Sequence, residues 1–146
     1  MGMQSRFVIG EPDDAERLAA CDDPCDGWDC FTCNGLCNIK LASLFAILTG
    51  DTSDAAIDRA IERIVETTPG DGSPWVNAVP NDIRDKYSEI AGMDGVQQGE
   101  IGRALAATPE LEGWSKEDVD ALVRTVGDFA ETARVADKSL WLWMSS

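Results

Sequence analysis

Histidine is absent from the sequence, and basic residues are scarce: 12 Lys and Arg stand against 27 Asp and Glu. Without imidazole, His-dependent catalytic triads and His-ligated metal sites are excluded. The net charge of −15 also disfavours nucleic acid and anionic membranes as partners, because binding to either depends on Lys and Arg. We therefore expect neither a nucleic-acid partner nor a membrane partner.

Long apolar runs are also missing. The longest covers residues 41–48, whereas a helix that crosses a bilayer needs ~20 apolar residues. The apolar stretch at residues 7–10 is too short for the hydrophobic region of a signal peptide. We therefore expect a cytoplasmic protein. Its 146 residues, of which 44% are hydrophobic, suffice for one domain that covers residues 1–146.

Hydrophobic periodicity and turn residues predict a single α+β domain. Short strands are expected at residues 6–9, 75–79 and 140–144. The C-terminal strand does not alternate between apolar and polar residues, which predicts that both of its faces are covered. Helices are expected at residues 15–20, 39–48, 82–91 and 98–107, with two more that begin after Ser53 and Ser115. The prediction is a small sheet of about three short strands, packed with five or six helices.

Three details of this prediction depend on particular residues. Asn38 and Asn81 are expected to cap the helices that follow them. The helix at residues 39–48 is apolar on all sides, which indicates the central buried element. Trp141 and Trp143 lie in the C-terminal strand, where we interpret them as core residues rather than as the lining of a ligand site.

All five cysteines lie in one Cys/Asp-rich loop at residues 21–37, which shows no usable periodicity. They are Cys21, Cys25, Cys30, Cys33 and Cys37. Thiolates separated by two to four residues can converge on one zinc ion, so zinc is the one cofactor that the sequence suggests. The aspartates between the cysteines are expected to raise the pKa of the thiols and so to oppose thiolate formation without a metal. Free or packed thiols, or one or two disulfides with an odd cysteine left over, are the alternatives.

Three functions remain open. The first is a binding or interaction module for a basic protein, for example an inhibitor or immunity protein, because a charge of −15 attracts positive partners. The second is a metal-binding or redox protein that uses the five cysteines. The third is an enzyme with a carboxylate in a cleft lined by Trp28 and the loop at residues 69–74. No particular catalytic residue can be assigned.

Three sequence blocks resemble an uncharacterised group of bacterial proteins of about this length. The blocks are KLASLFAILTG at residues 40–50, WVNAVP at residues 75–80 and KSLWLWMS at residues 138–145. The start Met1-Gly2-Met3, together with the Leu-Thr-Gly that ends the first block, also resembles the YfbM-like family of α+β bacterial proteins. These resemblances imply an α+β fold and a bacterial origin, and they carry over no catalytic residue.

Overall fold

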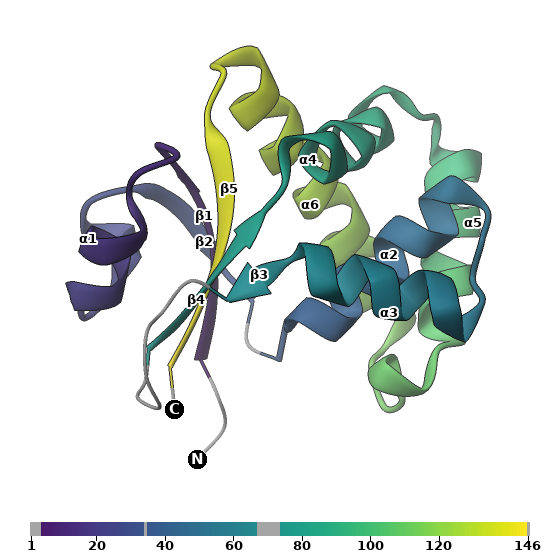
Figure 1. Ribbon diagram of the computed structural model, residues 1–146. Helices are drawn as coiled ribbons and strands as arrows, with labels where there is room; N and C mark the ends of the chain where they lie inside the picture. Colours follow the sequence, from purple (N-terminus) through teal and green to yellow (C-terminus); the bar gives the residue numbers. More distant parts are fainter. Residues whose placement is uncertain (1–3, 34, 67–73, 146) are drawn as a thin grey trace.

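A five-stranded sheet separates one short helix from a larger group of helices (Figure 1). The computed structural model describes residues 4–33, 35–66 and 74–145. The strands are β1 (Gln4–Gly10), β2 (Asp29–Thr32), β3 (Val65–Glu66), β4 (Trp75–Val79) and β5 (Ser139–Ser145). Their spatial order is β2-β1-β5-β4-β3, and all four neighbouring pairs are antiparallel. The C-terminal strand therefore lies at the centre of the sheet.

The prediction of about three strands was too low. The missed strands are the two edges of the sheet: β3 has two residues, and β2 lies inside the cysteine-rich loop that showed no periodicity. β2 is exposed at both ends and only partly buried at its two central residues, so it carries no alternating apolar pattern. Its pairing with β1, in which Cys30 lies opposite Val8, is a non-local contact that defines the strand.

Both faces of β5 are covered, as its sequence predicted. Leu140 and Leu142 face the larger group of helices, whereas Trp141 and Trp143 face helix α1 (Ala15–Ala20). The Trp143 indole donates a hydrogen bond of 3.1 Å to the Leu18 carbonyl, and the Trp141 indole donates one to the Glu11 carbonyl. Both rings are buried and have a partner for their N–H group, which confirms their interpretation as core residues.

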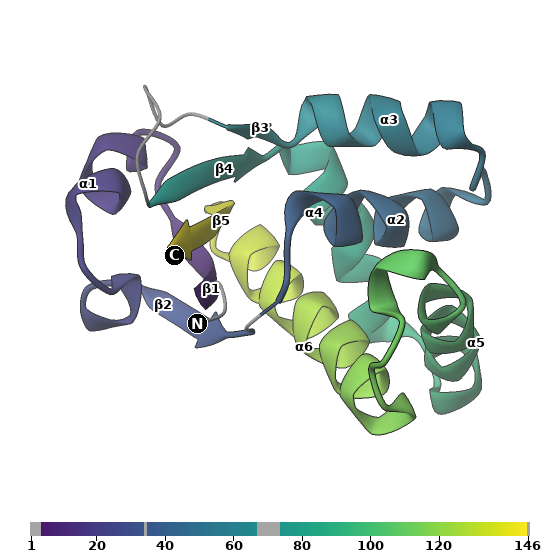
Figure 2. The ribbon, with the colours of Figure 1, turned by 90° about the horizontal axis from the view of Figure 1, so that it is seen from below.

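The remaining helices pack on the other face of the sheet (Figure 2). They are α2 (Asn38–Thr49), α3 (Asp54–Arg63), α4 (Asn81–Ser88), α5 (Gly95–Ala106) and α6 (Lys116–Val135), with the short 3-10 helices η2 (Glu89–Gly92) and η3 (Pro109–Leu111). A third 3-10 helix, η1 (Pro24–Asp26), lies beside α1 on the first face (Figure 2). The described residues thus contain six α-helices, within the predicted range. No helix in this part of the chain combines the length and apolar character needed to cross a bilayer.

Helix starts show which local predictions were correct. Ser53 and Ser115 are N-caps, and their hydroxyls accept hydrogen bonds from the backbone N–H groups of Ala56 and Asp118. Asn38 and Asn81, by contrast, are the first helical residues rather than the caps. α2 has a buried face, but Ile39 at its start is 40% exposed, so this helix is only partly enclosed. The predicted loop at residues 68–74 lies almost entirely outside the described residues.

Candidate functional site

The sheet divides the five cysteines between its two faces. Cys21 and Cys30 pack with the tryptophans on the α1 face, whereas Cys33 and Cys37 pack against the core on the opposite face. Cys25 forms a disulfide with Cys30, and their Cα atoms lie 5.2 Å apart. Cys21, Cys33 and Cys37 are free. The structure therefore does not bring all five sulfurs to one point, and Cys30 pairs with Cys25 rather than with Cys33.

Two of the free thiols are held in the protonated form. Burial raises the pKa of Cys21, and the charges of the nearby Asp23, Asp22 and Asp26 raise it further, in the direction expected from the sequence. Burial also raises the pKa of Cys33, although the Lys40 ammonium opposes the change. A thiol is a weak nucleophile compared with its thiolate, so neither environment activates its cysteine at neutral pH.

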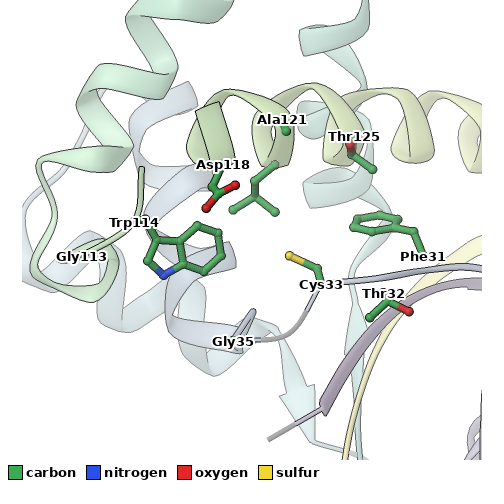
Figure 3. Close-up of a pocket in the computed structure, with 10 residues that line it drawn as sticks. Phe31, Thr32, Cys33, Gly35, Gly113, Trp114, Asp118, Ala121 and Thr125 are labelled. Carbon is green, nitrogen blue, oxygen red and sulfur yellow. The ribbon is translucent and has the colours of Figure 1, made fainter. Parts of the chain in front are cut away.

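An open pocket of about 440 Å³ lies where the end of β2 meets the start of α6 (Figure 3). We call it the Trp114 pocket. Its volume is in the range of small-ligand sites. It combines two aromatic walls, an acid at the start of α6 and a half-buried thiol. The residues that line it are Phe31, Thr32, Cys33, Gly35, Gly113, Trp114, Asp118, Ala121, Leu122 and Thr125.

The Phe31 wall of this pocket is fixed by aromatic packing. The Phe31 ring meets Phe129 edge to face, with 5.0 Å between the ring centroids. Phe7, which is fully buried, contacts both rings at centroid distances of 5.5 and 5.8 Å. Contacts of this kind stabilise one orientation of each ring, so the Phe31 side of the pocket is formed before any ligand arrives.

Trp114 forms the opposite wall, in the turn between η3 and α6. Its backbone N–H donates a 3.0 Å hydrogen bond to the Leu111 carbonyl. Gly35 passes close to the ring with a φ of 89°, and a Cβ there would lie 3.4 Å from the indole. The Lys40 ammonium lies 5.2 Å from the ring centroid and donates a hydrogen bond to the Gly35 carbonyl. Trp114 thus already takes part in one cation–π contact.

The Asp118 carboxylate points into the space between the walls, and the Cys33 sulfur faces the same space (Figure 3). Asp118 lies in the first turn of α6, where its backbone N–H is capped by Ser115. Its side chain is exposed, and it forms no ion pair or hydrogen bond with any other residue that the structure describes. The pocket therefore presents an unpaired negative charge beside two aromatic rings.

A second pocket, of about 460 Å³, contains Trp28 and is called the Trp28 pocket. Its lining residues include Gly10, Asp14, Arg17, Cys25, Trp28 and Lys138. Asp14 is only 2% exposed, and it is the buried carboxylate beside Trp28 that an enzyme hypothesis requires. The other part of that predicted cleft, the loop at residues 69–74, is not among the described lining residues.

Every contact of Asp14 points to a structural role. Its Oδ2 accepts hydrogen bonds from the Glu11 N–H at 2.7 Å and from the Trp28 indole at 2.9 Å, and its Oδ1 accepts one from Arg17. Burial alone would raise the pKa of Asp14, but these donors together hold the pKa below its ordinary value. A carboxylate that stays ionised and fully bonded is poorly suited to act as a general acid or base at neutral pH.

Comparison with known proteins adds little on function. No family model matches the chain, and no curated protein matches it. The fold is similar to the crystal structure of YfbM from Escherichia coli, a protein of unknown function, with 12% sequence identity and a TM-score of 0.46. The similarity covers 98% of this chain and 99% of YfbM.

Proposed function

We propose that this protein is a binding module for a basic protein, and that the Trp114 pocket receives an arginine side chain of the partner. The observation that carries the proposal is the unpaired Asp118 carboxylate, which faces a pocket walled by Trp114 and Phe31. An inhibitor or immunity protein directed against a basic enzyme or toxin is one concrete form of such a module.

The chemistry of the pocket suits a guanidinium group. A guanidinium can stack on an aromatic face while it donates two hydrogen bonds to a carboxylate. Tryptophan and arginine are also the residues that most often dominate the energy of protein interfaces. The aromatic walls supply the stacking surface and Asp118 supplies the counter-charge, so the pocket can anchor one side chain of a larger interface.

The charge of the whole molecule supports the same proposal. A net charge of −15 attracts a basic partner over distances of about the Debye length, which is ~10 Å at 0.1 M salt. This attraction raises the association rate more than it raises the affinity. Specificity must come from a local feature, and the Trp114 pocket provides one.

Two observations favour binding over catalysis at this pocket. The Cys33 thiol has a raised pKa because it is partly buried, so it is protonated at neutral pH. The chain contains no histidine that could remove its proton. The pocket thus combines recognition groups with an inactive thiol.

Calorimetric titration with a short Arg-Gly repeat peptide tests the proposal. We expect binding at low ionic strength that weakens as salt is added. Asp118→Asn should reduce the affinity about tenfold, because one charge-assisted contact is worth about 1.4 kcal/mol more than its neutral replacement. Trp114→Ala should reduce it further.

The matched control is Asp128→Asn, which removes the same charge from an exposed position of the same helix that does not line the pocket. When both variants are compared at ~0.1 M salt, this variant should retain the wild-type affinity within about twofold, because salt screens charges that lie more than ~10 Å from the bound peptide. Equal losses in the Asp118 and Asp128 variants would show that attraction is diffuse and that the pocket has no role. An absence of binding at low ionic strength would also contradict the proposal.

A further inference from the structure

A different group of residues, on the α1 side of the sheet, has the composition of a metal site. A carboxylate oxygen of Asp23 and the sulfur atoms of Cys25 and Cys30 all lie within 4.8 Å of one another. Cys25 is exposed and Asp23 is partly exposed, so a solvated ion can reach them. Cys33 and Cys37, which pack on the opposite face of the sheet, do not belong to this group.

The three side chains are held in place by the backbone. Cys30 lies in β2 opposite Val8 of β1. Asp23 caps the 3-10 helix η1, where its Oδ1 accepts a 3.0 Å hydrogen bond from the Cys25 N–H. The Trp28 N–H donates a 2.9 Å bond to the Pro24 carbonyl and so directs the chain back toward Cys30. Ligands fixed in this way lose little conformational freedom when an ion binds.

We propose that Asp23, Cys25 and Cys30 form a zinc site that exists only when the Cys25–Cys30 disulfide is reduced. In the oxidised protein the two sulfurs are bonded to each other, and neither is available as a thiolate ligand. Reduction and metal binding are therefore linked, and the disulfide and the zinc complex are alternative states of the same two sulfurs. This inference is independent of the binding function proposed above.

Reduction of the disulfide and binding of zinc are two separate steps, and each conserves atoms and electrons. A dithiol reductant transfers two electrons and two protons to the disulfide, which gives two thiols, and the reductant becomes a disulfide. Zn²⁺ then displaces one proton from each thiol and binds the two thiolates together with the Asp23 carboxylate. Three protein ligands leave the fourth tetrahedral position for water. Oxidation of the thiolates by a disulfide compound reverses the sequence and releases the ion.

The donor set and its surroundings favour zinc over harder cations. Thiolates prefer zinc to magnesium or calcium, which bind through oxygen atoms. Among the residues that the structure describes, Arg6 is the cation that pairs with a ligand, and its Nε lies 3.5 Å from Asp23 Oδ1. Arg17 and Lys138 line the same pocket as Cys25 but form their ion pairs with Asp14 and Glu11. Asp23 Oδ2 has no hydrogen-bond or ion-pair partner in the same described set, so it remains open to an ion.

Metal titrations of the reduced and oxidised protein test the proposal. The protein is reduced with a phosphine, which does not compete for metal as a thiol would, and is then titrated with Co²⁺ and with Zn²⁺ against a coloured chelator. We expect one ion per reduced chain, thiolate-to-cobalt charge-transfer bands in the near ultraviolet, and no binding to the oxidised chain. Cys25→Ser and Cys30→Ser should abolish the bands, and Asp23→Asn should weaken Zn²⁺ binding at least tenfold.

Cys33→Ser is the matched control, because it removes a thiol from the other face of the sheet and should leave metal binding unchanged. A second measurement needs no variant: Zn²⁺ should protect Cys25 and Cys30 of the reduced wild-type protein from alkylation, as mapped by mass spectrometry. The proposal fails if reduced protein shows no charge-transfer bands, if oxidised protein binds equally well, or if protection appears at Cys33 and Cys37 instead.

Discussion

Replacement of the buried Asp14 by asparagine should destabilise the protein by about 2 kcal/mol at neutral pH. Asp14 Oδ2 accepts two hydrogen bonds, from the Glu11 N–H and from the Trp28 indole. The amide oxygen of asparagine can keep both bonds but loses the negative charge. A hydrogen bond to a charged group contributes about 1 kcal/mol more than a neutral one, and two such bonds give the stated loss. The third contact, from Arg17, adds little because that side chain is 69% exposed.

The same structure sets the pH dependence of this effect. The pKa of Asp14 is lower in the folded protein than its ordinary value of 3.8. A carboxyl group with a lowered folded pKa stabilises the protein above its unfolded pKa, and that stabilisation is lost as the pH falls through the folded pKa. The difference between wild type and Asp14→Asn should therefore be constant from pH 7 to about pH 5 and should shrink below about pH 4.

Urea unfolding at a series of pH values measures this difference. Asp13→Asn is the matched control, because Asp13 is the adjacent residue and is exposed. This control should change the unfolding free energy by less than about 0.5 kcal/mol. Equal stability of the Asp14 and Asp13 variants at pH 7, or a difference that persists unchanged at low pH, would refute this account of the Asp14 contacts.

Three further predictions concern other parts of the chain. Gly127→Ala should destabilise the protein by about 1–2 kcal/mol in the same urea assay, because the new Cβ would lie 2.7 Å from the Cβ of Ile90. Gly99→Ala is its control: a Cβ there meets nothing within 4 Å, so this variant should stabilise the protein by up to about 1 kcal/mol. Burial raises the pKa of Tyr87 far above its usual value of 10.0, so stability should fall above about pH 10 in the wild type and fall less in Tyr87→Phe. Lys40→Met should strengthen binding of the Arg-Gly peptide severalfold in calorimetry, because it removes a like charge beside Trp114.

Elements defined by local sequence were predicted well. Helix α1 and strand β4 have the bounds expected from their residues. The caps of α3 and α6 follow from Ser53 and Ser115, and the uninterrupted apolar sequence of β5 indicated its central place in the sheet. In each case a few neighbouring residues carry the whole physical signal.

Features that depend on distant contacts were not predictable in the same way. β2 is a strand because it pairs with β1, and no periodicity within residues 29–32 reveals this. The Trp114 pocket forms because Phe31 and Asp118, which are distant in the sequence, line the same space in the fold. In the sequence, Asp118 is recognisable only as an acidic residue in the first turn of a helix. The bonding of Asp14 to Trp28 likewise joins residues 14 positions apart.

The central claim is that the Trp114 pocket anchors a basic partner. Its most direct test is a titration with the Arg-Gly peptide that is followed by nuclear magnetic resonance. The account predicts that the largest shifts fall on the Trp114 indole N–H and on the backbone signals of Cys33 and Asp118. Shifts spread evenly over the acidic surface, or concentrated at Trp28 in the other pocket, would contradict it.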